Sequence, residues 1–277
     1  MPVHIALEFD KQLAKAISNL RQNLIKAARN PAKAASVITH KVLAPVGHRD
    51  YRKFVVLTRD RTGSNRLIQA LNSHPKIASD YEVFGKIYDS SEREILDRTF
   101  GRQPFYIAAK GFKIFYYHPQ DRTDSPIWAM LRDIEDLHVI QLRRENLLHA
   151  LVSSRIAYQT GVYGIRTDGD AKSYDIDAAK VQFTPEELEA DFARNKEWED
   201  WGKTHFSDKP FLDVTYEDTV IDLARETSRI STFLGLKPHS PKTDFRKQRH
   251  NPINETIENY EELKRHFQSS RWRSFFE

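Results

Sequence analysis

A strand-like run that ends in a basic, polar turn and continues as a helix is the feature that most limits how this chain can fold. Residues 54–57 are apolar, the turn over residues 58–65 carries two arginines, and helical spacing of apolar residues begins at Leu67. A strand that passes into a helix in so few residues is typical of a parallel α/β sheet, because parallel strands need long crossover connections.

The alternation of strands and helices continues along the chain. Strand-like runs cover residues 54–58, 106–117, 137–142 and 211–215, and helical patterns lie after Ser64 and over residues 90–99, 127–135, 146–158, 185–203 and 220–234. We therefore predict an α/β fold with a central parallel sheet flanked by helices. Thr184, Pro185 and two glutamates predict a helix start, since Thr caps and Pro suits the first helical position.

Composition excludes several kinds of site. The chain has 277 residues, 30% of them charged, and no apolar run near the roughly 18 residues that a membrane span needs. With no cysteine, it has no disulfide framework, no thiolate zinc site and no cysteine nucleophile. The first 20 residues lack the layout of a secretory signal, so we expect a cytoplasmic protein.

The N-terminal segment predicts a separate amphipathic helix. Apolar residues from Leu13 to Ala28 recur at helical spacing, and lysines and arginines occupy the opposite face. Docking on the chain's own domain, docking on a second subunit as a homodimer, and contact with a membrane surface all fit this pattern. Pro45 and Gly47 break the pattern, so we expect a helical extension over residues 1–50 and a main domain over residues 51–277.

The turn over residues 58–65 is suited to binding an anion. A helix that begins directly after a polar turn directs backbone N–H groups and a positive dipole at one place. Thr62, Ser64 and Asn65 add short donors, Gly63 allows close approach of the backbone, and Arg61 supplies a planar guanidinium. The nucleoside triphosphate loop G-x-x-x-x-G-K-[ST] fits poorly, because Ser64 stands where its lysine would be.

A second anion site follows the strand-like run over residues 137–142. Arg143 and Arg144 end this run, and Ser153 lies ten residues after Arg143 on the next predicted helix. An arginine at the strand end and a serine on the helix converge on one group if the helix folds back beside the strand. Ligands of open α/β sheets bind outside the carboxyl ends of the strands, so both basic turns should lie at the same edge.

Together these stretches resemble the sulfotransferase family, most closely the bacterial carbohydrate sulfotransferases of the trehalose-sulfating kind. The segment R-T-G-S-N (residues 61–65) is similar to the family's 5′-phosphosulfate loop, and L-R-R-E-N…S (residues 142–153) is similar to its 3′-phosphate motif. Asn65 stands where a hydroxyl residue is more usual in the family. Arg66 replaces a usually apolar residue and is either a helix-surface residue or an extra phosphate contact.

Three further segments extend the resemblance over residues 51–277. They are D-Y-E-V-F (residues 80–84), the Y-E-D ending of residues 211–218, and a late K-Q…I-x-N-Y segment over residues 245–260. The resemblance implies a nucleotide-kinase-like fold with a P-loop-like turn. It also implies that 3′-phosphoadenosine 5′-phosphosulfate (PAPS) is bound by residues 61–66, by Arg143, Arg144 and Ser153, and by Lys247 and Gln248.

The implied reaction is transfer of a sulfuryl group from PAPS to a hydroxyl group of a carbohydrate or glycolipid-type acceptor. The resemblance implies that Glu82 is the general base, and we assign Arg61 to the charge on the transferring group. His118 and Asp80 are reserve candidates for the base, and Glu217 is interpreted as structural. The scheme needs no metal, and the histidines show no H-E-x-x-H or similar spacing.

Two other functions remain open from sequence alone. A kinase-like phosphotransferase would bind nucleoside triphosphate with magnesium, and a non-catalytic binder of an anionic polymer would use the arginines without nucleotide preference. Nucleic acid is not expected as a partner, because aromatic residues are not interleaved with the cations. Candidate stacking residues for an acceptor sugar are Tyr116, Tyr117, Tyr163, Trp198 and Trp201, although Trp198 and Trp201 also have the spacing of core residues.

Overall fold

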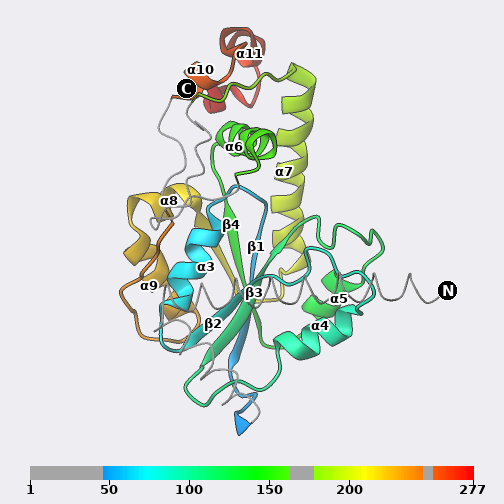
Figure 1. The fold of residues 1–277 in the computed structure, drawn as a ribbon, viewed down its shortest axis with the longest axis vertical. Helices are drawn as coiled ribbons and strands as arrows, with labels where there is room; N and C mark the ends of the chain where they lie inside the picture. Colours follow the sequence, from blue (N-terminus) through cyan, green and yellow to red (C-terminus); the bar gives the residue numbers. More distant parts are fainter. Residues whose placement is uncertain (1–45, 163–177, 246–251) are drawn as a thin grey trace, which may run out of the picture. The chain divides into compact units, whose positions relative to one another are not determined.

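The computed structural model describes residues 46–162, 178–245 and 252–277 (Figure 1). The larger of two compact units consists of Asp50–Gly101 and Tyr106–Glu277. In the described part of the smaller unit, His48 and Gln103 exchange two backbone hydrogen bonds. The predicted extension over residues 1–50 lies almost wholly outside the described residues, and its helix and its contacts stay predictions.

Five parallel strands form the sheet of the larger unit, in the order β2-β3-β1-β4-β5. Their bounds are β1 Arg52–Thr58, β2 Ile77–Glu82, β3 Ala109–Phe115, β4 Leu137–Arg143 and β5 Phe211–Thr215. Thr58 pairs with Phe115 and Arg143 with Thr215, so these strands end together at one edge. The predicted fold class is confirmed, and the two basic turns lie at the same edge, as expected.

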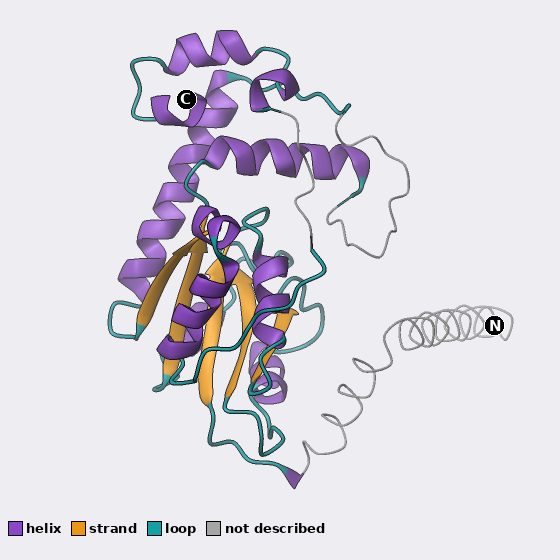
Figure 2. Cartoon of the chain, turned by 90° about the vertical axis from the view of Figure 1, so that its left-hand side faces the viewer, coloured by secondary structure: helices purple, strands orange, loops and turns teal. Residues whose placement is uncertain are grey.

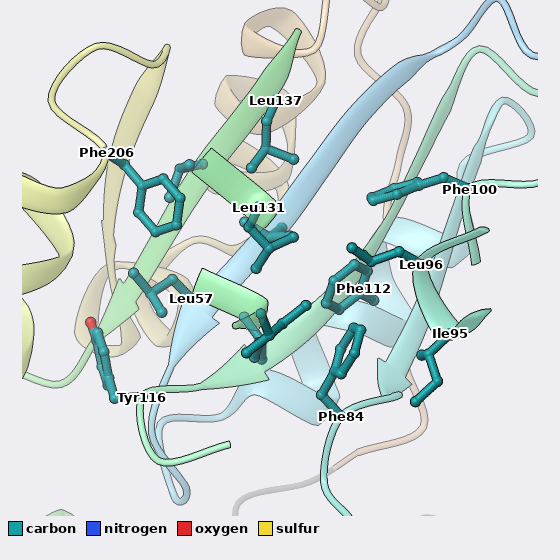
Figure 3. Close-up of a cluster of buried hydrophobic side chains, with 14 of the residues drawn as sticks. Leu57, Phe84, Ile95, Leu96, Phe100, Phe112, Tyr116, Leu131, Leu137 and Phe206 are labelled. Atoms are coloured by element: carbon teal, nitrogen blue, oxygen red, sulfur yellow. The ribbon is translucent and has the colours of Figure 1, made fainter. Parts of the chain in front are cut away.

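Helices cover both faces of this sheet (Figure 1). Because side chains alternate along a strand, Phe54 and Val56 pack in one cluster with α3 (Ser64–Asn72) and α9 (Leu223–Phe233). Val55 and Leu57 pack in another with α4 (Glu92–Thr99) and α5 (Ile127–Arg132). Figure 3 shows this second cluster, with Leu57, Phe84, Phe112 and Leu131 among its labelled side chains.

A third hydrophobic cluster lies beyond the carboxyl edge of the sheet. It is built from α6 (Leu147–Thr160), the first half of α7 (Pro185–His205) and the C-terminal elements α10 (Ile253–Thr256), α11 (Tyr260–Phe267) and η2 (Arg273–Phe276). Figure 2 shows α6 lying across the ends of the strands. The start of α7 matches the prediction, since Thr184 and Glu187 form a capping box and Pro185 opens the helix.

Some elements differ from the sequence-based expectation. The run predicted from residue 106 becomes a strand only at Ala109, and β2 was not predicted. The helix expected over residues 220–234 is two helices, α8 (Tyr216–Ile221) and α9, because Asp222 has extended backbone and caps α9 through its side chain.

No helix in the described residues is long and apolar enough to cross a membrane.

Candidate active site

Buried hydroxyl groups fix the turn after β1. The Thr58 hydroxyl donates to the carbonyl oxygen of Leu142 at 2.6 Å and lies 2.7 Å from the Thr62 hydroxyl. Thr62 Oγ1 also lies 3.0 Å from the carbonyl oxygen of Arg59, and both threonines are fully buried. The Thr62 side chain therefore shapes the turn and joins it to β4.

The backbone of this turn depends on a glycine. Gly63 has φ 74° and stands at the N-cap of α3, which has no side-chain cap and no acidic residue in its first turn. The ring of Tyr216 covers Gly63 so closely that a Cβ there would lie 2.7 Å from ring atom Cδ2. The turn and the N-terminus of α3 thus present backbone N–H groups at a place suited to an anion.

We expect Gly63→Ala to destabilise the protein more than Gly161→Ala. Both glycines have a left-handed backbone, with φ 74° and 69°, but a Cβ at Gly161 meets nothing within 4 Å. The difference isolates the contact with Tyr216, which should cost about 1–3 kcal/mol as overpacking. Urea unfolding of the two variants measures it, and equal losses would show that the ring moves aside at no cost.

Residues of the two basic motifs contact each other. Arg61 Nε donates to Ser153 Oγ at 2.9 Å, and Arg144 donates to the carbonyl oxygen of Arg61 at 3.1 Å. The Arg144 guanidinium lies over the Tyr216 ring, 4.5 Å from its centroid, and its burial lowers its pKa. The predicted fold-back of α6 thus brings Ser153 to the turn after β1.

Arg143 points elsewhere. Its Nε lies 3.1 Å from both carboxylate oxygens of Asp213 on the neighbouring strand β5. In this structure Ser153 contacts Arg61, and the expected convergence of Arg143 with Ser153 is not seen. A role for Arg143 in donor binding stays a prediction.

Glu82 belongs to a polar network that sequence reasoning missed. A register shift between Asp80 and Glu82 places Glu82 opposite Lys113 of β3, and the Lys113 ammonium lies 2.7 Å from Glu82 Oε1. The same ammonium lies 2.5 Å from Asn65 Oδ1 and 3.4 Å from Ser64 Oγ. One buried lysine thus joins the candidate base to the first turn of α3.

Lys113 is 1% exposed, whereas the Glu82 side chain is 38% exposed. Burial lowers the pKa of Lys113, and the Glu82 carboxylate opposes this effect. The carboxylate therefore reaches solvent at the carboxyl edge while its partner stays in the sheet. The signal in the sequence was a lysine placed between the apolar residues Phe112 and Ile114 of a predicted strand.

His118 lies in the same region with one ring nitrogen engaged. Its Nδ1 accepts a hydrogen bond from the Phe115 backbone N–H at 3.2 Å, so the neutral ring carries its proton on Nε2. Burial lowers the pKa of His118 to about 4, Glu82 raises it and Lys113 lowers it. Nε2 is buried and has no hydrogen-bond partner within the described residues.

Several other candidates are committed to structural contacts. Asp80 pairs with Lys110 at 2.6 Å, and Arg66 donates to the carbonyl oxygen of Thr219 at 2.9 Å. Arg66 therefore connects α3 to α8. Glu217 accepts from the backbone N–H of Glu145 at 3.0 Å, which agrees with its structural interpretation.

The remaining candidates divide into three groups. Lys247, Gln248 and Tyr163 lie outside the described residues. Tyr116 and Trp201 pack in the hydrophobic cluster of α4 and α5, while Tyr117 and Trp198 line a cavity between α6 and α7. Within the described ranges no group of three or more His, Asp or Glu side chains is placed to hold a metal ion, and the expectation of a metal-free reaction remains to be tested.

Comparison with known proteins gives relatives along most of the chain. This chain is 28% identical over 243 residues to Nodulation protein H of Rhizobium tropici, and the match covers 81% of this chain and 92% of that protein. It is also 28% identical over 258 residues to Nodulation protein H of Rhizobium meliloti (strain 1021), covering 87% of this chain and 98% of that protein. No family model matches the sequence.

Solved structures include two more distant likenesses. A sulfotransferase from Alicyclobacillus acidocaldarius has a TM-score of 0.45 and 13% identity, covering 80% of this chain and 94% of that one. A mouse sulfotransferase complexed with PAP has a TM-score of 0.40 and 14% identity, covering 72% of this chain and 64% of that one.

Proposed function

We propose that this chain, an enzyme of the sulfotransferase family, transfers a sulfuryl group from PAPS to a hydroxyl group of a carbohydrate acceptor. The observation that carries the proposal is the meeting of two sets of side chains at the N-terminus of α3. Arg61, Ser153 and Arg144 form one set through their hydrogen bonds, and Lys113, which pairs with Glu82 and contacts Asn65 and Ser64, forms the other. The first set suits an anionic donor and the second suits activation of a hydroxyl group.

The donor's phosphosulfate would bind at the turn over residues 58–65. Backbone N–H groups at the start of α3 would contact its oxygens, with Arg61 and Ser64 at the sulfuryl end. Arg144 and Ser153 would hold the 3′-phosphate, together with Arg143, Lys247 and Gln248 as the family resemblance implies. The absence of acidic residues from the first turn of α3 supports this assignment, since no carboxylate there would repel the anion.

In the proposed reaction the acceptor oxygen attacks sulfur in line with the leaving phosphate. The new O–S bond forms as the phosphate O–S bond breaks, the electron pair goes to the phosphate, and the acceptor proton goes to Glu82. Charge that develops on the sulfuryl and bridging oxygens would be stabilised by Arg61 and the α3 N–H groups. The base role stays with Glu82, because Nδ1 of the neutral His118 ring accepts the Phe115 backbone N–H and its Nε2 carries the proton, so neither nitrogen is open to the acceptor's proton.

Donor preference tests the proposal directly. We expect adenosine 3′,5′-bisphosphate at 100 times its Kd to raise the melting temperature by roughly 5 °C, because a ligand that binds only the native state stabilises it. ATP with magnesium should raise it much less, since Ser64 stands in place of the lysine of a triphosphate loop. A thermal-shift titration measures both ligands.

Arg144→Ala sharpens this test. Loss of its charge-assisted contacts should weaken adenosine 3′,5′-bisphosphate binding by about 1–3 kcal/mol. Arg271→Ala is a matched control, since Arg271 also stacks on an aromatic ring, Trp272, but belongs to the C-terminal elements. Preference for ATP, or binding that depends only on salt with no nucleotide selectivity, would refute sulfuryl transfer in favour of the kinase or polymer-binding alternatives.

A further inference from the structure

We propose that Asp60 is a positioning residue of the transfer, which holds Arg61 where the donor's phosphosulfate would bind. This role rests on the proposed sulfuryl transfer, and it adds a carboxylate that acts through Arg61 and does not itself touch the donor. Asp60 is the single acidic residue in the turn over residues 58–65. Because a carboxylate repels an anionic ligand, its presence in this turn needs a structural reason, and its contacts supply one.

Two adjacent residues of the turn are bonded to two adjacent residues of α6. Ser154 Oγ donates a hydrogen bond to Asp60 Oδ2 at 2.7 Å. Beside it, Arg61 Nε donates to Ser153 Oγ at 2.9 Å. The turn therefore accepts one hydrogen bond from the helix and gives one to it. These contacts fix the turn against α6 at neighbouring points, so a shift of Asp60 would be passed on to Arg61.

The other oxygen of the Asp60 carboxylate has more distant partners. Oδ1 lies 3.3 Å from Arg59 Nη2 and 3.4 Å from the Tyr117 hydroxyl, at the long end of the range for hydrogen bonds. Arg59 also lies 3.4 Å from Asp191 of α7. The Asp60 carboxylate is thus contacted from α6, from the turn itself and from the segment after β3, and the bond from Ser154 is the shortest of the three.

The backbone of Arg61 shows why the turn needs an anchor here. Its φ is 61°, in the left-handed region, which is disfavoured for a residue that carries a Cβ. Such a backbone persists only where the surrounding structure fixes it. Ser154 anchors Asp60 on one side of Arg61, and the buried Thr58 hydroxyl anchors Thr62 on the other. Without the Asp60 anchor, we expect Arg61 to relax toward an ordinary backbone conformation and its guanidinium to move away from α6.

A carboxylate that positions Arg61 and a carboxylate that is merely close to the site have opposite effects on anion affinity. If Asp60 only repels the donor, its removal raises the affinity. If it positions Arg61, its removal lowers the affinity although a negative charge is lost. Ser154→Ala separates position from charge, because it breaks the same hydrogen bond and leaves the carboxylate in place.

The test compares two nucleotides by calorimetry on the full-length protein. Adenosine 3′,5′-bisphosphate carries the 5′-phosphate that the turn would bind, and adenosine 3′-monophosphate lacks it. We expect Asp60→Ala and Ser154→Ala each to weaken binding of the bisphosphate by about 5- to 30-fold, within the range for a lost charge-assisted contact. Their affinity for the monophosphate should change by less than about twofold, as expected for a part of the ligand that binds independently of the turn.

Ser125→Ala is the matched control. Ser125 also donates to a carboxylate at 2.7 Å, that of Glu92 at the start of α4. Among the described residues, neither Ser125 nor Glu92 is bonded to the turn over residues 58–65. This variant should leave the affinity for both nucleotides unchanged.

A double-mutant cycle tests whether Asp60 acts through Arg61. Arg61→Ala removes the guanidinium, so in that background Ser154→Ala should change the bisphosphate affinity by less than about twofold. The cycle needs only the bisphosphate, and it is decisive even where the monophosphate binds too weakly to measure.

Three outcomes would overturn the role of Asp60. Equal or higher bisphosphate affinity in Asp60→Ala would identify a charge that only repels the ligand. An equal loss of affinity for both nucleotides would indicate a general disturbance of the site, and a Ser154→Ala effect that persists in the Arg61→Ala background would show that Arg61 is not the group being positioned. Failure of the unmodified protein to bind the bisphosphate would instead refute the proposed sulfuryl transfer.

Discussion

Glu82→Gln should reduce turnover by about 10²–10⁴-fold while donor binding stays nearly unchanged. Glutamine keeps the size of the side chain and can still accept a hydrogen bond from Lys113, but it cannot take the acceptor's proton. The Glu82 carboxylate is the one we assign as the base because it reaches solvent at the carboxyl edge and contacts, through Lys113, the start of α3. Initial rates with PAPS, together with adenosine 3′,5′-bisphosphate titration, measure the two effects separately.

Asp80→Asn is the matched control for this experiment. Asp80 lies on the same strand and is also paired with a lysine of β3, Lys110, at 2.6 Å. Within the described residues, Lys110 forms no hydrogen bond to the turn over residues 58–65, so the turnover of Asp80→Asn should change by less than about threefold. If Asp80→Asn lost activity and Glu82→Gln kept it, the role of base would pass to Asp80.

The fold could be predicted because local patterns carry it. The apolar run over residues 54–57 and the capping signals at Thr184 and Pro185 act over a few residues, and both elements formed where expected. The strand β2 was missed because it is an edge strand with the sequence I-A-S-D-Y-E. Its two inward residues, Ile77 and Ser79, give too weak an alternation to identify.

The candidate site was predicted less completely because its contacts are long-range. The basic turns were assigned to one edge from the parallel topology alone. Which arginine meets Ser153 depends on the chain's path beyond each strand: Arg61, in the turn after β1, contacts Ser153, whereas Arg143, at the end of β4, pairs with Asp213. Tyr216 and Gly63 are 153 positions apart in the sequence, and Lys113 and Asn65 are 48 positions apart. No local sequence pattern could therefore predict these two contacts.

Arg66 makes a long-range contact that the sequence does not reveal, and its role as a phosphate contact stays a prediction. From the sequence it was either a surface residue of α3 or a further phosphate contact. Its hydrogen bond to the Thr219 carbonyl oxygen at 2.9 Å satisfies one of the carbonyl groups that α8 leaves unpaired at its C-terminal end. The guanidinium thereby connects two helices through an interaction that sequence periodicity does not reveal.

Lys113→Met should reduce turnover by about 10²-fold or more while leaving the free energy of unfolding nearly unchanged. The ammonium lies 2.7 Å from Glu82 and 2.5 Å from Asn65, so its loss releases the proposed base from the turn over residues 58–65 and removes a positive charge beside the proposed transfer. Stability should be spared for two reasons. Methionine fills a similar volume without the cost of burying a charge, and the Glu82 left behind is open to solvent.

Lys110→Met tests whether this effect is specific, and pH tests its cause. Lys110 is buried in the same strand and paired with a carboxylate, but it does not contact α3, so its variant should keep turnover within about threefold.

Because burial lowers the pKa of Lys113 below its usual 10.5, the unmodified enzyme should lose activity on the alkaline side before that pH, as the ammonium deprotonates and the ion pair is lost. The unfolded chain binds more protons in this window, so Lys113 should also make stability rise with pH there. Lys113→Met should abolish both the alkaline fall in activity and this rise in stability. If they persist in the variant, another group causes them, and Lys113 only fills space in the strand.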